Sequence, residues 1–335
     1  MGIGTMRHVR VYGTLGPACA DAETLKRMLS EGMDGMRLNL SHTALEAAAE
    51  LLDAFRSAAT ACKKTPELLI DMQGPELRLG TLPAPVRLNG ETLLSADELP
   101  FPDEVKEVLN RAPFGQEVLL DDGKILLKTA EAQRLRVLRG GVLESRKSVA
   151  LPGCAIPTPA MTEADLRHIG MAKSYGVTAV MQPFVRGKED LIAVRDALDR
   201  ADGKEIRLLA KIENTAGIDR LEELLPHCDE VVVARGDLGN AVPLWELPAV
   251  QKQIAAVCRR TGKDFMVVTQ MLDSMQRSPV PTRAEVSDIF NAVLDGAASV
   301  MVTGETASGA YPVEVIHYLV ETVRAAEAYS ERALC

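Results

Sequence analysis

The sequence predicts an α/β protein built as a (β/α)8 TIM barrel, with a small β-rich lid domain inserted after the third strand. Short apolar runs alternate with amphipathic segments before residue 81 and again after residue 152, which is the pattern of parallel strands joined by crossover helices. Eight such runs occur in these two blocks. The combined length of the blocks, about 260 residues, suits a (β/α)8 barrel. A doubly wound open sheet is the alternative, but no Gly-x-Gly-x-x-Gly motif follows the first run.

The first block, residues 1–80, contains three predicted strands and two predicted helices. We expect the strands at residues 9–14, 36–40 and 68–71. Asp21 is placed to cap a helix over residues 23–30, which Gly32 ends. An alanine-rich helix is expected over residues 44–61.

The segment of residues 81–152 lacks this alternation and indicates a separate lid domain. Its short alternating runs are separated by turn sequences such as Asp121-Asp122-Gly123 and Arg139-Gly140-Gly141, which favour β-hairpins. The runs lie at residues 117–120, 124–128, 135–138 and 142–145. A short helix is expected over residues 103–110.

The second block, residues 153–335, returns to the strand and helix alternation and completes the barrel. Thr162 begins its first helix with a capping signature. Strands are expected at residues 177–181, 206–212, 231–234, 264–269 and 299–303. Further helices are expected at residues 188–198, 217–225, 247–260, 284–294 and 312–331.

The composition is that of a globular protein and excludes several classes of partner. Of the 335 residues, 47% are hydrophobic but only 4% are aromatic, so we expect an aliphatic core. The net charge of -9 argues against a nucleic-acid surface. The chain has no signal-peptide start and no run near the ~18 apolar residues of a membrane span, so we expect a cytoplasmic protein. The six cysteines have no paired or metal-ligand spacing and are expected to be reduced thiols.

Charged side chains follow two predicted strands of the second block. Lys211 and Glu213 are two residues apart, so they share one face of a strand. If the strands are neighbours, Glu213 and Asp237 lie at the same end of the sheet, roughly 5 Å apart by strand spacing. Two carboxylates beside a lysine suit Mg2+ or Mn2+ and a phosphate-bearing ligand. A strand-end salt bridge explains the same residues equally well.

A second polar group lies at the end of the strand at residues 36–40. Arg37, Asn39 and Ser41 alternate and therefore point to one side, which suggests a ligand site; an edge strand facing water is the alternative. In a barrel the carboxyl ends of all strands converge on one face. The polar strand ends that would meet there are Arg37, Asn39, Ser41, His42, Asp71, Lys211, Glu213, Arg235, Gly236, Asp237, Thr269, Thr303, Gly304 and Glu305. This mixture of cations, carboxylates and hydroxyls suits a metal-bridged phosphate.

Short motifs along nearly the whole chain then point to a family. They are Gly13-Thr14-Leu15-Gly16-Pro17, Arg37-Leu38-Asn39-Leu40-Ser41-His42, Gly74-Pro75-Glu76-Leu77-Arg78, residues 119–123, Ser145-Arg146-Lys147, Lys211-Ile212-Glu213-Asn214, residues 234–239, residues 269–275, Pro281-Thr282-Arg283-Ala284-Glu285 and Gly304-Glu305-Thr306-Ala307. In type and order they resemble the motifs of the pyruvate kinase family. Each motif is weak alone, but together they are very specific.

The resemblance implies a barrel with a mobile lid over its carboxyl-end face. It also implies phosphoryl transfer from phosphoenolpyruvate to ADP, giving pyruvate and ATP, with Mg2+ (or Mn2+) and K+ as cofactors. By similarity, Lys211 stabilises the moving phosphoryl group and Arg37 is a second catalytic cation. Thr269 and Thr303 match the residues that relay a proton to the enol carbon. Substrate-binding positions, besides Lys211, are Gly236, Asp237 and Thr269.

The resemblance also implies where cations and the nucleotide bind. Glu213 and Asp237 match the ligands of the divalent ion. The monovalent-ion positions are Asn39, Ser41, Asp71 and the carbonyl of Met72. Glu76 matches the acidic residue of members that require K+. The positions facing nucleotide and phosphate are Arg37, Asn39, His42, Arg78, Asp122 and Lys147.

The sequence departs from the family pattern at three places. Gln182-Pro183 stands before Phe184-Val185-Arg186, where the family has a small serine, and Asn240-Ala241 stands where the family has an acidic residue. The chain stops at Cys335, where the family continues into a further α/β domain with sugar-phosphate sites and an oligomer interface. We therefore expect a short form without this C-terminal regulatory domain and its allosteric control. Any oligomer, most simply a homodimer, would rest on barrel surfaces.

Two other functions remain open. One is a metal-dependent lyase or decarboxylase acting on a 2-oxo acid, because the same metal could stabilise an enolate. The other is a weakly active homologue that binds metabolites or a partner. The intact nucleotide positions Arg78 and Lys147 favour the kinase over the lyase, and retention of Lys211, Glu213 and Asp237 argues against a degenerate site.

Overall fold

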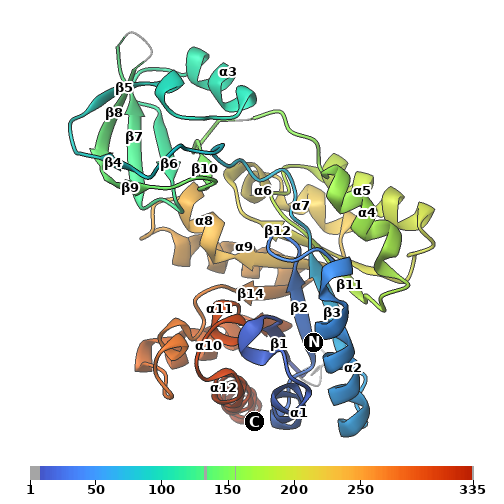
Figure 1. The fold of residues 1–335 in the computed structure, drawn as a ribbon. Helices are drawn as coiled ribbons and strands as arrows, with labels where there is room; N and C mark the ends of the chain where they lie inside the picture. The colour runs from blue at the N-terminus through green and yellow to red at the C-terminus, as the bar shows by residue number, and fades with distance from the viewer. Residues whose placement is uncertain (1–7, 132–133, 155, 334–335) are drawn as a thin grey trace.

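Eight parallel strands close into a barrel in the computed structural model, which describes residues 8–131, 134–154 and 156–333 (Figure 1). Their order around the barrel is β1-β15-β14-β13-β12-β11-β3-β2. The strands are β1 (Arg10–Thr14), β2 (Gly35–Asn39), β3 (Glu67–Asp71), β11 (Ala179–Gln182), β12 (Arg207–Ile212), β13 (Glu230–Ala234), β14 (Asp264–Val268) and β15 (Ser299–Met301). The predicted (β/α)8 barrel is confirmed.

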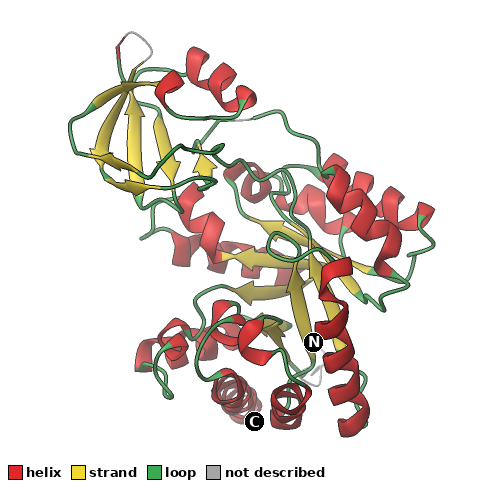
Figure 2. Ribbon diagram, viewed as in Figure 1, coloured by secondary structure: helices red, strands yellow, loops and turns green. Residues whose placement is uncertain are grey.

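Helices surround the barrel strands on the outside (Figure 2). The helices outside the lid are α1 (Ala22–Glu31), α2 (Ala49–Cys62), α4 (Glu163–Ala172), α5 (Lys188–Arg200), α6 (Thr215–Asp219), α7 (Leu221–Leu224), α8 (Arg235–Ala241), α9 (Leu247–Thr261), α10 (Arg283–Leu294), α11 (Gly304–Ala307) and α12 (Pro312–Ala333). The Asp21 carboxylate accepts from the backbone N–H of Thr24, and Gly32 ends α1 at φ 119°. Both predicted signals of α1 are thus confirmed.

Several predicted boundaries were wrong for local reasons. The helix expected over residues 217–225 is two short helices, α6 and α7, separated at Arg220 (φ −103°, ψ 13°). Pro226 then holds a 3-10 turn, since proline has no N–H to continue an α-helix. The strand expected to reach Thr269 stops at Val268, because Thr269 has φ +84°, outside the β region. Strand β15 likewise stops at Met301.

The core is mainly aliphatic, as the low aromatic content predicted. Inside the barrel, apolar side chains from different strands pack together: Tyr12, Leu69, Ala179, Met181, Leu209, Val232, Ala234, Met266, Val268 and Met301. A larger apolar layer fills the space between the strands and the helices. Among the fully buried side chains, Tyr12 and Phe265 are the bulkiest. The barrel is therefore a packed core, and ligands must bind at one of its ends.

Two antiparallel sheets form the segment between β3 and β11. One has the order β10-β6-β7-β8-β5 and the other pairs β4 with β9. Their strands are β4 (Val86–Leu88), β5 (Leu93–Ser95), β6 (Glu117–Leu120), β7 (Ile125–Thr129), β8 (Arg134–Arg139), β9 (Gly141–Leu143) and β10 (Val149–Ala150), with helix α3 (Asp103–Arg111) beside them. These strands and α3 pack around their own apolar core. The inserted β-rich lid is confirmed, while its predicted limits at residues 81 and 152 stay a prediction.

One predicted hairpin of the lid is present and one is not. Strands β6 and β7 pair across the Asp121-Asp122-Gly123 turn, as expected. The turn at Gly140 does not join a hairpin, because β8 pairs with β7 and β5 whereas β9 pairs with β4. A Cβ at Gly140 would lie 2.1 Å from the carbonyl oxygen of Leu88, so the β4 backbone approaches too closely for any other residue.

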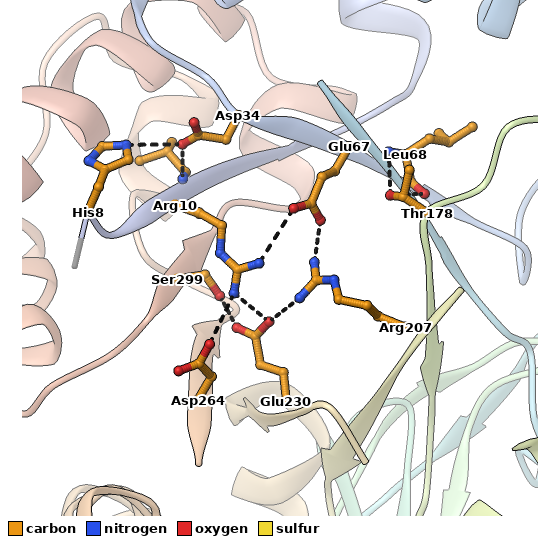
Figure 3. A network of polar contacts seen from close by, with 11 residues as sticks. His8, Arg10, Asp34, Glu67, Leu68, Thr178, Arg207, Glu230, Asp264 and Ser299 are labelled. Carbon is orange, nitrogen blue, oxygen red and sulfur yellow. Dashed lines mark hydrogen bonds and ion pairs between the residues drawn. The ribbon is translucent and has the colours of Figure 1, made fainter. Parts of the chain in front are cut away.

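The amino-end face of the barrel is closed by a network of charged side chains (Figure 3). Arg10 Nη2 and Arg207 Nη1 lie 2.8 Å and 3.0 Å from Glu230 Oε2. Both arginines also pair with Glu67, and the Ser299 hydroxyl donates to Glu230. Glu230 is fully buried. Charges at this end are matched with one another, which leaves the opposite face as the candidate ligand site.

The predicted reduced state of the cysteines agrees with the structure for the described residues. Cys19, Cys62, Cys154, Cys228 and Cys258 are free thiols, whereas Cys335 lies outside the described residues. Burial raises the pKa of Cys19 to about 11 and the pKa values of Cys228 and Cys258 to about 12. Among the described helices, none combines the length and the apolar content that crossing a membrane requires.

Candidate active site

A buried carboxylate joins two cations at the carboxyl ends of β2, β3 and β12. Asp71, the last residue of β3, receives Arg37 Nε at 2.8 Å and Arg37 Nη2 at 2.7 Å on its Oδ2 atom. Lys211 Nζ lies 3.2 Å from both Asp71 oxygens. The cations hold the pKa of the Asp71 carboxyl below its usual value although burial opposes this. Asp71 therefore fixes the positions of both positive side chains.

Glu213 lies on the other side of Lys211. Its Oε1 atom is 2.9 Å from Lys211 Nζ, and its Oε2 atom accepts the backbone N–H of Phe184 at 2.8 Å. Burial raises the pKa of Glu213 to about 7; Lys211 opposes the shift, while Asp237 and Asp71 add to it. The contact between Lys211 and Glu213 agrees with the prediction, from their spacing along the strand, that they share one face.

Asp237 completes the acidic part of this site from helix α8, which begins directly after β13. Burial raises the pKa of Asp237, Lys211 opposes the shift, and the charges of Glu76, Asp122 and Asp71 add to it. Glu213 and Asp237 thus disfavour each other's charged form, which a divalent cation between them would relieve. The donor set is all carboxylate oxygen, as hard divalent cations prefer, so the residues fit such an ion.

The protein alone offers few ligands to that ion. In the described ranges, no group of three or more His, Cys, Asp or Glu side chains is arranged to hold a metal. Mg2+ in proteins is commonly bound by one or two carboxylates, with phosphate oxygens and water filling the other positions. The arrangement therefore suits a cation that is bound together with an anionic ligand.

Thr269 lies against Gly236 in a strained conformation. Its φ of +84° is uncommon for a β-branched residue, and a Cβ at Gly236 would lie 3.3 Å from Thr269 Cγ2. Arg235 holds this conformation by donating from Nε and Nη2 to the Thr269 carbonyl at 3.1 and 2.7 Å. Arg235 in turn pairs with Asp288 at 2.6 Å. The sequence placed Arg235 at a strand end but did not reveal this role, because Asp288 and Thr269 are distant in the chain.

Thr303 is held by a carboxylate from helix α11. Its backbone N–H and hydroxyl donate to Glu305 Oε2 at 2.7 and 3.2 Å. The other Glu305 oxygen accepts the N–H of Leu272 at 3.2 Å, and the side chain is almost fully buried. Glu305 therefore connects the loop after β15 to the loop after β14, which carries Thr269. Sequence reasoning noted Glu305 but not this connecting role.

The four predicted monovalent-cation positions lie on adjacent strand ends. Asn39 pairs with Asp71 in the register of β2 and β3, and Leu40 N–H donates to the Asp71 carbonyl at 2.9 Å. Asn39 Oδ1 accepts the backbone N–H of Ser41 at 3.1 Å. Met72 follows Asp71 directly. The Asn39 amide oxygen and the Asp71 carbonyl thus lie on neighbouring strand ends, and oxygen donors are the kind that hard cations use.

The predicted nucleotide-facing residues divide between the barrel and the lid. Arg78 Nη2 pairs with Glu76 Oε1 at 2.8 Å, and Lys147 Nζ pairs with Asp121 Oδ1 at 3.1 Å. Asp122 Oδ1 accepts the Ser148 hydroxyl at 2.7 Å. The structure does not bring His42 into the Lys211 cluster: its side chain is exposed, and it is fixed only through its backbone.

The lid meets the barrel beside helix α8 (Figure 1). A Cβ at Gly123 would lie 2.7 Å from Asn240 Oδ1, at the end of helix α8. The charge of Asp122, next to Gly123, contributes to the raised pKa of Asp237 in the same helix. The tip of the lid turn therefore lies close to helix α8, which carries Asp237. Asn240 is one of the positions where the sequence departs from the family pattern.

Comparisons with known proteins agree with this architecture. The family model described as pyruvate kinase, barrel domain, matches residues 6–316. A pyruvate kinase of Methylorubrum extorquens is 39% identical over 92% of this chain and 66% of its own length. Those of Bacillus licheniformis and Geobacillus stearothermophilus are 35% and 36% identical, over 98% and 92% of this chain and 58% and 55% of their own lengths. The chain thus spans roughly 55–66% of the length of these curated relatives.

The fold and the site define a lidded (β/α)8-barrel protein with a lysine, an arginine and three acidic side chains at the carboxyl-end face of the barrel. Within this class of barrel proteins, the comparisons identify the family. The chain belongs to the pyruvate kinase family.

Proposed function

We propose that the protein transfers a phosphoryl group from phosphoenolpyruvate to ADP, giving pyruvate and ATP. The observation that carries the proposal is Lys211, held between Asp71 and Glu213 at the carboxyl-end face of the barrel. Phosphoryl transfer depends mainly on positioned positive charge around the moving group. A fixed lysine beside an arginine and a carboxylate pair supplies that charge pattern.

Each part of the site has a distinct task in this proposal. Lys211 and Arg37 stabilise the negative charge that develops on the transferred phosphoryl oxygens. The backbone N–H groups of Gly236 and Asp237 lie in the first turn of α8, where helical N–H groups have no intrahelical partner, and they bind the substrate carboxylate. The Thr269 hydroxyl is the third group at that carboxylate.

The second half of the reaction is proton delivery to the enol carbon of pyruvate. Thr269 and Thr303 carry hydroxyls in the loops after β14 and β15 and would relay this proton through their Oγ1 atoms. Arg235 and Glu305 keep these two threonines in place. Lid closure excludes water, which protects the phosphoryl group from hydrolysis.

Glu213 and Asp237 would hold the divalent cation, Mg2+ or Mn2+. Asn39, Ser41, Asp71 and the Met72 carbonyl would hold K+, with Glu76 nearby in the segment that leads to the lid. When bound, the divalent ion neutralises phosphate oxygens and orients the donor and acceptor groups. The chain's own contribution is to fix the two carboxylates at the end of β12 and the start of α8.

The decisive measurement is a coupled assay with phosphoenolpyruvate, ADP, Mg2+ and a series of K+ concentrations. ATP formation supports the kinase. Release of CO2 from oxaloacetate without ATP formation would instead support a 2-oxo acid decarboxylase. Ligand binding without turnover in either assay would support the third alternative, a weakly active homologue that binds metabolites or a partner.

Removal of divalent cations is expected to abolish phosphoryl transfer, with recovery on adding Mg2+ or Mn2+. Glu213→Gln and Asp237→Asn should each raise the half-saturating metal concentration by at least about tenfold, since each removes one of two anionic ligands. Mn2+ binding measured by electron paramagnetic resonance provides a readout without turnover. Glu222→Gln, on the barrel exterior, is the control and should leave binding unchanged. Equal Mn2+ affinity in all four proteins would exclude the assigned ligands.

Gly123→Ala is expected to lower kcat/KM for ADP by about tenfold, because two costs oppose lid closure. Gly123 has φ +76°, which disfavours alanine by about 1 kcal/mol. A Cβ there would also press on Asn240 Oδ1 at 2.7 Å. Combining Gly123→Ala with Asn240→Ala should recover the steric part of the loss. An unchanged kcat/KM in the single variant would show that this turn does not need to reach the barrel.

A further inference from the structure

Asp165 is a buried carboxylate at the point where two chain segments connect the barrel to the lid. Its Oδ1 atom accepts the backbone N–H of Gln73 at 2.9 Å, and its Oδ2 atom accepts that of Gly74 at 3.1 Å. Oδ2 also accepts the backbone N–H and the hydroxyl of Thr162, both at 2.8 Å. The chain leaves the barrel through residues 73–74 and re-enters it at Thr162. One side chain therefore holds both connections.

The outgoing connection is fixed tightly at this point. Gly74 has φ +61°, and a Cβ there would lie 2.4 Å from Pro183 Cγ, so the backbone fits closely against the loop after β11. Glu76 follows two residues later and influences Asp237 in the candidate active site. A shift of the Gly74 backbone would therefore move the acidic residue that borders the site.

The returning connection is fastened by two groups of the barrel. Thr162 and Asp165 form the capping box that begins helix α4. Farther upstream, Arg186 donates to the hydroxyl and the carbonyl of Thr158, each at 2.9 Å. Asp190 orients Arg186 through bonds of 2.8 to 3.0 Å. Asp165 differs from Arg186 because it also reaches the outgoing segment.

We propose that Asp165 is a positioning residue that couples the two lid connections and sets where the lid rests over the active site. The proposal rests on the proposed phosphoryl transfer, because that reaction needs the lid turn over the carboxylates. All four groups around Asp165 are donors, and an ionised carboxylate accepts at both oxygens. An asparagine would direct its NH2 group at a donor, so it cannot replace this pattern.

The test is Asp165→Asn, with Glu285→Gln as the matched control. Glu285 forms the same kind of capping box at α10: it accepts the N–H and the hydroxyl of Thr282 and also two donors of Ser274, outside the helix. Both variants should lose stability to urea. Only Asp165→Asn should raise KM for ADP, by about tenfold, and lower kcat, because misplacement of the lid by about 1 Å is enough for such losses.

Hydrogen exchange provides a readout that does not depend on turnover. In Asp165→Asn, peptides covering residues 72–80 and 156–162 should exchange faster in the presence of Mg2+ and ADP, whereas Glu285→Gln should leave them unchanged. If the wild-type protein has no activity, the proposed reaction is wrong, but the hydrogen-exchange comparison between the two variants can still be made. Stability loss alone, with unchanged KM and unchanged exchange in these peptides, would reduce Asp165 to a helix cap and overturn the proposal.

A milder variant keeps the test decisive if Asp165→Asn does not fold. Thr162→Val removes one donor to Asp165 but leaves the bonds to Gln73 and Gly74 in place. We expect a smaller rise in KM for ADP, about threefold, since one of four hydrogen bonds is lost. A KM equal to that of the wild type, with the helix cap demonstrably weakened, would contradict coupling between the two connections.

Discussion

Replacing Lys211 with methionine is expected to lower kcat for ATP formation by at least about 10³-fold, while the protein still folds and binds ADP. Methionine retains the unbranched apolar stem of the lysine side chain but removes its charged end. The charge matters most when negative charge moves onto the transferred group, so the loss should appear in kcat rather than in KM.

The electrostatics of the site explain why no other group can replace Lys211. Burial alone lowers the pKa of a lysine, but Asp71 and then Glu213 raise the pKa of Lys211 by more, so it lies above its usual value. Lys211 therefore remains protonated at every pH at which the protein would be assayed. Loss of activity at high pH must come from other groups. Arg37 is the other cation at Asp71, and this ion pair favours its present position.

The control for this variant is Lys252→Met. Lys252 is an exposed lysine of helix α9 that pairs with Asp295 at 2.8 Å. It contacts none of the site residues named above, so its loss should leave kcat unchanged. Urea unfolding of both variants shows whether Glu213, which loses a partner in Lys211→Met, disturbs the fold. Comparable kcat values for Lys211→Met and the wild type would exclude the role given to Lys211.

The barrel and much of the site could be predicted because they depend on local patterns. An apolar run followed by charged residues marks a strand and its carboxyl end, so Lys211 and Glu213 were placed together from their spacing. Their neighbour Asp71 could not be paired with Lys211 in this way, since 140 positions separate them. The two residues meet because the strand order of the barrel places β3 and β12 on either side of β11.

Other features were missed because they depend on contacts with no local signal. β4 approaches Gly140 closely and pairs with β9 outside the main lid sheet, and no turn rule contains that information. Asp165 had a clear capping signature, yet its bonds to Gln73 and Gly74 depend on an element 91 residues or more away. Capping signatures predict where a helix begins, but they do not predict what else the capping carboxylate holds.

Glu230→Gln is expected to have the largest effect on stability, about 3 kcal/mol, because it removes the charge that compensates two arginines at the closed end of the barrel. Glu230 is fully buried and receives Arg10 at 2.8 Å and Arg207 at 3.0 Å. Glutamine keeps one acceptor oxygen but leaves its NH2 group facing these cations. Glu67 remains as a partner of both arginines, which keeps the loss from being larger.

The measurement is urea unfolding followed by circular dichroism, with Glu222→Gln as the control. Glu222 pairs with Arg260, and the two side chains are 68% and 60% exposed, so removing this charge should cost less than about 1 kcal/mol. Glu230→Gln should lower the urea midpoint clearly and leave KM for ADP unchanged, since the network lies at the face opposite the site. Equal midpoints for the two variants would show that the buried network contributes no more than a surface ion pair. A changed KM would show instead that the amino-end network is coupled to the lid face through the strands.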